Sequence, residues 1–102
     1  MSTAARLAAT RVALPDDDTL AAMAKAVAHP ARLKILRLLD ARRTCVTGDV
    51  VIEVGLAQST VSEHLRILRE AGLIQGEIEG PRTRYCLSAA GLATLKAGIV
   101  AL

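Results

Sequence analysis

The stretch Leu56–Leu87, LAQSTVSEHLRILREAGLIQGEIEGPRTRYCL, decides the fold of this chain. Its first half predicts an amphipathic helix over about 57–71, because apolar residues recur at i, i+4 and i+7. These residues are Val61, Leu65 and Leu68. Gly72 supplies a stop at the end of this helix. A brief helix is expected just upstream, over 48–54, and Gly55 turns the chain between the two. A short helix, a glycine turn and a second helix with one apolar face together predict a helix-turn-helix.

The second half of the stretch predicts a β-hairpin. Residues 74–79 alternate in polarity as a strand does, Gly80-Pro81-Arg82 forms a tight turn, and residues 83–87 return as the second strand. Upstream of the helix-turn-helix, the β-prone run 44–47 is expected to form one more short strand.

Outward from this stretch, the chain is expected to form helices over four further ranges: 3–13, 19–28, 31–41 and 88–102. The carboxylates of Asp16–Asp18 favour the start of the second of these helices, because they accept hydrogen bonds from its free amides. His29-Pro30 ends it, since a residue before proline is pushed out of the helical region. The helix over 31–41 is apolar around most of its circumference, which places it at the centre of the core. Ser88 is expected to cap the last helix.

The composition points to a single, mainly α domain over residues 1–102. Of the 102 residues, 52% are hydrophobic, yet the chain has one tyrosine and neither tryptophan nor phenylalanine. The core must therefore consist of aliphatic side chains, which suits packed helices with one small hairpin. So many aliphatic residues on a short chain also indicate a second buried surface, a subunit interface.

Several classes of protein are disfavoured. No apolar run approaches the ~20 residues that span a bilayer, and the first fifteen residues lack the apolar run of a signal peptide, so a cytoplasmic protein without membrane contact is expected. The scarcity of aromatic residues disfavours single-stranded nucleic acid, which is usually bound by stacking. An enzyme is not expected, because the sequence has no phosphate loop, no paired carboxylates and no third group to orient Glu63 and His64.

The helix over 57–71 carries a polar face that a major groove would accept. Its residues are Gln58, Ser59, Ser62, Arg66 and Arg69. Glutamine can pair with adenine, arginine with guanine, and serine with phosphates or base edges. Arg82 and Arg84 on the hairpin stand where they could contact the DNA backbone or the minor groove. On spacing alone, an ordinary solvated face fits this pattern as well as DNA binding does.

Two runs, AVAHPARLKILRLL at 26–39 and LAQSTVSEHLRILREAGLIQGEIEGPRTRYCLS at 56–88, resemble the ArsR/SmtB family of bacterial repressors. The resemblance implies a winged helix-turn-helix homodimer that dimerises through its N- and C-terminal helices. It also implies a repressor that occupies a duplex DNA operator and leaves it when an inducer binds. The positions that match the family's recognition helix are Gln58, Ser59, Thr60, Ser62 and Arg66, and those that match its wing are Arg82 and Arg84. A winged-helix module that binds only proteins is the alternative.

The cysteines bear on the inducer. The family's zinc-type site uses Asp, His and Glu on the last helix, and residues 88–102 contain none of these. The resemblance implies that the strand 44–47 pairs with the second wing strand, which would make Cys45 and Cys86 neighbours. Three interpretations stay open: two small buried hydrophobes, a thiolate site for a trivalent arsenic species, or a reversible, regulatory disulfide. An operator-binding repressor released by a trivalent arsenical is the leading prediction, and a repressor switched by a Cys45–Cys86 disulfide is the alternative.

Neither histidine is expected to bind a metal: His29 is expected to be a helix-end residue, and His64 to pack or form a hydrogen bond within the fold.

Overall fold

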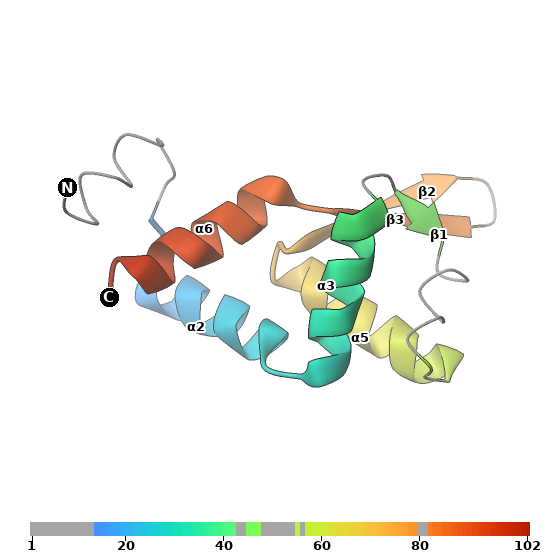
Figure 1. The fold of residues 1–102 in the computed structure, drawn as a ribbon, viewed down its shortest axis with the longest axis horizontal. Helices are drawn as coiled ribbons and strands as arrows, with labels where there is room; N and C mark the ends of the chain where they lie inside the picture. Colours follow the sequence, from blue (N-terminus) through green and yellow to red (C-terminus); the bar gives the residue numbers. More distant parts are fainter. Residues whose placement is uncertain (1–13, 43–44, 48–54, 56, 80–81) are drawn as a thin grey trace.

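The computed structural model describes residues 14–42, 45–47, 55, 57–79 and 82–102. Within these ranges the chain is mainly α-helical with one small sheet, as predicted, and Figure 1 shows the sheet at one end and α2 and α6 at the other. The elements are α2 (Asp17–Val27), α3 (Pro30–Arg42), β1 (Val46–Thr47), α5 (Gln58–Glu70), β2 (Ile74–Glu79), β3 (Arg82–Leu87) and α6 (Ala89–Val100).

Side-chain caps begin two of the helices. Asp16 precedes α2 and accepts a hydrogen bond from the amide of Thr19 at 2.8 Å, which satisfies one of the donors left free in a first helical turn. Ser88 does the same for α6 through the amide of Gly91 at 3.1 Å. Both caps were expected from the sequence. The helix predicted over 19–28 starts two residues earlier than expected, because Asp16 is the capping residue.

The core lies where α2, α3, α5 and α6 meet the inner face of the sheet. All three residues of the predicted α5 stripe are buried, and Leu68 has no exposed surface. The largest fully buried side chains are Ile35, Leu39, Val61, Leu68, Leu73 and Ile74. As expected, α3 is central, since it packs against α2, α5 and β3. One of its apolar residues, Leu33, nevertheless lies at the surface.

The three strands form an antiparallel sheet in the order β1-β3-β2. The predicted pairing of the short upstream strand with the second wing strand is confirmed, since Val46 lies opposite Tyr85. One bound is corrected: Arg82, predicted as part of the turn, is the first residue of β3 and pairs with Glu79. Its pairing extends the hairpin ladder by one step.

The link from α5 to the sheet depends on a glycine. Gly72 has φ +77°, a conformation that L side chains rarely adopt, so the chain can turn there directly from α5 into β2. The carbonyl of Gly72 also lies so close to Gly91 of α6 that a side chain at Gly91 would collide with it. Both positions therefore need glycine.

Three sequence-based predictions lie outside the described residues. They concern the helix over 3–13, the brief helix over 48–54 and the turn residues Gly80-Pro81. Among the helices that are described, none has the length and apolar character required to cross a bilayer.

Candidate functional site

The exposed face of α5 carries most of the residues predicted to read DNA. Ser59, Thr60, Ser62 and Arg66 are all exposed, opposite the buried stripe of the same helix. The backbone of Gln58 forms the first residue of α5. The helix is preceded by Ala57, whose side chain offers no capping acceptor. Amides of the first turn are therefore available to an anion such as a DNA phosphate.

Arg66, at the middle of this face, is held by two carboxylates on its own helix. Its Nε donates to Glu63 at 3.0 Å, its Nη2 makes a second bond to Glu63, and its Nη1 donates to Glu70 at 2.9 Å. The spacing of three and four residues places these side chains together on the helix surface. The hydrogen bonds to Glu63 and then Glu70 raise the pKa of Arg66, and the bond from Arg66 lowers the pKa of Glu63. A DNA base must therefore compete with two carboxylates for this guanidinium.

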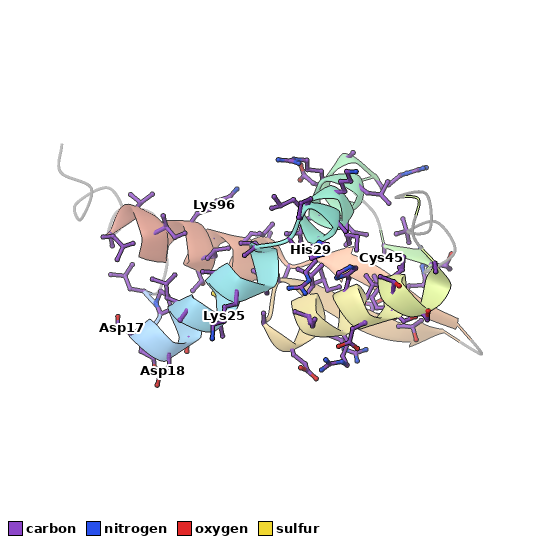
Figure 2. The ribbon with its side chains drawn as sticks, turned by 90° about the horizontal axis from the view of Figure 1, so that it is seen from below. Asp17, Asp18, Lys25, His29, Cys45 and Lys96 are labelled. Atoms are coloured by element: carbon purple, nitrogen blue, oxygen red, sulfur yellow. A yellow bond between two sulfur atoms is a disulfide. The ribbon has the colours of Figure 1, made fainter. Side chains whose placement is uncertain are left out.

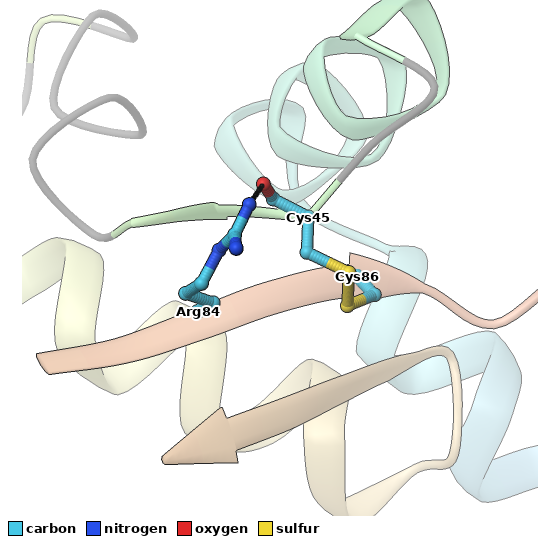
Figure 3. Close-up of a disulfide and its surroundings, with 3 residues drawn as sticks. All are labelled: Cys45, Arg84 and Cys86. Carbon is cyan, nitrogen blue, oxygen red and sulfur yellow. Dashed lines mark hydrogen bonds between the residues drawn. A yellow bond between two sulfur atoms is a disulfide. The ribbon is translucent and has the colours of Figure 1, made fainter. Parts of the chain in front are cut away.

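Of the two arginines predicted for the wing, the side chain of Arg84 binds the protein's own backbone. Arg84 is half-buried, and its Nη2 donates to the backbone carbonyl of Cys45 at 2.8 Å, so the guanidinium points back across the sheet to the residue before β1 (Figure 3). The backbone of Arg82 forms the first residue of β3. A further arginine on the predicted polar sector, Arg69, lies with its side chain over Gly76 of β2.

Cys45 and Cys86 form a disulfide that joins the segment before β1 to the wing strand β3 (Figure 3). Their Cα atoms are 4.3 Å apart, as suits directly opposed residues in an antiparallel pair without mutual hydrogen bonds. Continuing the register of β1 and β3 beyond Val46 and Tyr85 places the two cysteines opposite each other. The predicted proximity is thus confirmed. Both residues are only half-buried, so the interpretation as two buried hydrophobic thiols is wrong.

His64 is the one buried polar or charged side chain among the described residues. Its Nδ1 accepts a hydrogen bond from Nε of Arg32 at 3.0 Å, and its ring lies 4.5 Å from that of His29, which Figure 2 shows at the junction of α2 and α3. Arg32 also donates to the carbonyl groups of Lys25 and Ala26 at 3.3 Å. The cluster ties the end of α2 to α3 and α5, which confirms the packing and hydrogen bonding expected of His64.

This cluster makes stability depend on pH. Burial, then the charges of His29 and Arg32, lower the pKa of His64 below its usual 6.5. Below pH 6.5 the unfolded chain therefore binds a proton that the folded chain excludes, so the free energy of unfolding falls as the pH decreases towards the folded-state pKa. Above pH 6.5 the contribution is fully present. A protonated Nδ1 could not accept the bond from Arg32.

Urea denaturation at a series of pH values would measure this dependence. The His64→Gln variant is expected to lose the part of the slope that lies just below pH 6.5. An unchanged slope in the variant would assign the dependence to other groups.

Three acidic residues near the site have no functional role in the sequence-based prediction. Glu63 and Glu70 hold Arg66, and their spacing on the helix was a sufficient signal for that pairing. Glu77 is exposed on β2, and its carboxylate lies within 4.8 Å of both cysteine sulfurs. Its position follows only from the register of the hairpin, which places Glu77 opposite Arg84, two residues from Cys86.

Several known proteins are similar to this chain. The sequence signature described as "Bacterial regulatory protein, arsR family" matches residues 29–75. The HTH-type transcriptional regulator CmtR of Mycobacterium tuberculosis (strain ATCC 25618 / H37Rv) is 40% identical over 78 residues, which cover 76% of this chain and 64% of CmtR. The chain thus spans a little less than two thirds of the length of that relative.

Two solved structures are also similar to this chain. A crystal structure of a possible transcriptional regulator for arsenical resistance has a TM-score of 0.69 and 31% identity, covering 76% of this chain and 79% of that one. The homodimeric winged helix-turn-helix DNA-binding domain Mb0332 of Mycobacterium bovis has a TM-score of 0.67 and 30% identity, covering 80% and 75%. This chain therefore belongs to the arsR family of bacterial regulatory proteins and has their winged helix-turn-helix fold.

Proposed function

We propose that this regulator is an operator-binding repressor whose affinity for duplex DNA is set by the thiol state of Cys45 and Cys86. The observation that carries the proposal is the position of the disulfide, which joins β3 of the wing to the segment leading into the helix-turn-helix. Under the proposal, residues 1–102 form one winged helix-turn-helix domain in the cytoplasm. The contacts to DNA would come from Gln58, Ser59, Thr60, Ser62, Arg66, Arg82 and Arg84.

A homodimer completes the proposal. Large apolar side chains are exposed at the end of the molecule formed by α2 and α6, namely Leu14, Ile99, Val100 and Leu102. Exposed apolar residues gathered in one region favour a subunit interface. The similarity to the homodimeric Mb0332 domain supports the same arrangement. Two copies of α5 would then read two half-sites of one operator.

The proposed switch is an ordinary thiol oxidation. A thiolate of the pair attacks a peroxide and becomes a sulfenic acid, and the second thiol displaces water to form the disulfide. The two thiols lose two electrons and the peroxide is reduced. Disulfides in the cytoplasm are rare as structural bonds, which favours a regulatory one. Closing the bond fixes the wing strand against β1, where Arg84 already binds the carbonyl of Cys45. This restricts how the wing can approach DNA.

A second inducer would use the same two sulfurs. A monosubstituted trivalent arsenical needs two thiolates, and the opposed cysteines could bridge one arsenic atom once the disulfide is reduced. Inorganic arsenite prefers three thiolates, and the chain has only two cysteines. Release by a monosubstituted arsenical is therefore the form of the arsenic hypothesis that the site supports.

Fluorescence anisotropy with DNA from upstream of the protein's own operon tests the proposal. Reduced wild type is expected to bind, and peroxide treatment to weaken binding roughly 5- to 150-fold, the usual range of coupling between two sites. Cys45→Ser should bind as the reduced wild type does and ignore both peroxide and a phenyl arsenical.

The matched control is the double variant Cys45→Ser/Cys86→Ser, which has no thiol left and excludes cross-linking between chains. Equal release of Cys45→Ser and wild type would refute regulation through the pair. Failure of the reduced wild type to bind any operator fragment would favour the alternative, a winged-helix module that binds only proteins.

A further inference from the structure

The wing brings a carboxylate to the two cysteines. The Sγ atoms of Cys45 and Cys86 and a carboxylate oxygen of Glu77 all lie within 4.8 Å of one another. Each group comes from a different part of the sheet: the residue before β1, the central strand β3 and the outer strand β2. Sites built on paired strands are held more firmly than sites on loops.

The strand register explains why the three groups share one face. Side chains alternate across a strand, so positions that pair directly point to the same side. Glu77 pairs with Arg84, two residues before Cys86, and Cys45 stands opposite Cys86 when the register of β1 is continued. The other face of the sheet holds Val46 and Ile74, which are buried in the core. The two sulfurs and the carboxylate therefore gather on the outer side.

We propose that Cys45, Cys86 and Glu77, with the cysteines reduced, form a binding site for a borderline-soft divalent cation of the Zn²⁺ or Cd²⁺ class. Zinc binds thiolate sulfur at ~2.3 Å and carboxylate oxygen at ~2.0–2.2 Å in a tetrahedron, so ligand atoms stand roughly 3.5–3.8 Å apart. The separations of up to 4.8 Å to the carboxylate need only a small adjustment of exposed or half-buried side chains. The fourth position would be taken by water.

The donor set selects the class of cation. Thiolates favour Zn²⁺ and Cd²⁺ over Mg²⁺ and Ca²⁺, which prefer oxygen ligands. A monosubstituted trivalent arsenical, in contrast, is satisfied by the two sulfurs and has no need of Glu77. The carboxylate therefore distinguishes a cation site from the arsenical site.

The charges of the site also fit a divalent cation. Binding removes one proton from each thiol, so two thiolates and one carboxylate carry three negative charges against two on the cation. Arg84, whose guanidinium binds the carbonyl of Cys45, supplies a nearby positive charge that offsets the remaining one. The disulfide and the cation exclude each other, because the bond occupies both sulfurs. Oxidation would therefore expel the cation.

The inference rests on the proposed function only in its use of the same two thiols, and its test needs no DNA. Protein reduced with a phosphine and kept under inert gas is titrated with Cd²⁺, and the ultraviolet thiolate-to-cadmium absorption is recorded. Wild type is expected to bind one Cd²⁺ per chain with the absorption of two thiolates. Glu77→Gln should bind more than roughly tenfold more weakly, since even residues beyond the direct ligands typically alter affinity tenfold or more.

Matched variants separate the possible outcomes. Glu79→Gln removes the same charge from the same strand and should bind Cd²⁺ as wild type does. Cys45→Ser should lose the two-thiolate absorption. Titration with a phenyl arsenical should give equal affinities for wild type and Glu77→Gln. The site is refuted if reduced wild type does not bind Cd²⁺, and Glu77 is refuted as a ligand if its variant binds like wild type. Neither result depends on whether the protein binds an operator.

Discussion

Replacing Leu68 by alanine is expected to lower the free energy of unfolding by about 2–5 kcal/mol, a large part of the 5–15 kcal/mol typical of a small domain. Leu68 has no exposed surface and belongs to the buried stripe of α5 that meets α3 and β2. Truncation removes the apolar burial and leaves a cavity that the surrounding helices can fill only in part. Because α5 carries the predicted DNA-reading face, the same variant should also lose operator affinity once it begins to unfold.

Urea denaturation at one fixed protein concentration measures this loss, since the stability of a dimer depends on concentration. Leu33→Ala is the matched control, because it makes the same chemical change at a position that is 37% exposed on α3. It should alter stability by no more than about 0.5–1 kcal/mol. A loss below about 1 kcal/mol for Leu68→Ala would contradict the described core.

Replacing Arg66 by alanine is expected to weaken operator binding roughly 5- to 150-fold, the effect of losing one bidentate base contact. The change should act in two ways. It removes the donor that could pair with a guanine edge, and it leaves Glu63 and Glu70 facing DNA phosphates without the cation that binds them both. The fold should be unaffected, because all three side chains are exposed.

Anisotropy titrations with the operator and with a scrambled duplex, at several salt concentrations, distinguish the two kinds of contact. A loss of affinity confined to the operator indicates a base contact. An equal loss of affinity for both duplexes, with the slope of log affinity against log salt concentration smaller by about 1, indicates a phosphate contact. Arg37→Ala, which removes one exposed positive charge from α3, is the control and should change the affinity for either duplex little. Unchanged binding by Arg66→Ala would exclude this residue from the interface.

The two proposals for the sheet describe alternative states of one site. The disulfide joins Cys45 to Cys86, whereas the cation would hold the same sulfurs apart and add Glu77. Both states act at the place where the wing meets the segment before the helix-turn-helix. Oxidant, arsenical and cation would therefore each bias the same junction through different covalent or coordinate bonds. The Glu77→Gln variant separates the cation from the other two.

The sequence by itself predicted the helices and strands that the structure describes. The period of the apolar residues predicted α5 over 57–71, within one residue of Gln58–Glu70 at each end. The same stripe of leucine and valine predicted which face of the helix is buried. Capping by Asp16 and Ser88 was equally local, since each side chain bonds an amide three residues later. The hairpin followed from alternation and turn residues, although the extent of β3 differed by one residue.

Only the tertiary structure decided which distant groups meet. Cys45 and Cys86 are 41 residues apart, and their disulfide depends on the register of β1 against β3. Because a slip of one residue would send every side chain to the opposite face, no local pattern could establish that register. Likewise, Glu77 approaches the sulfurs because of the register of β2 against β3, and Arg32 binds His64 because α3 packs against α5. Helix periods and caps are set by neighbours in the chain, whereas this site is set by how the strands and helices pack.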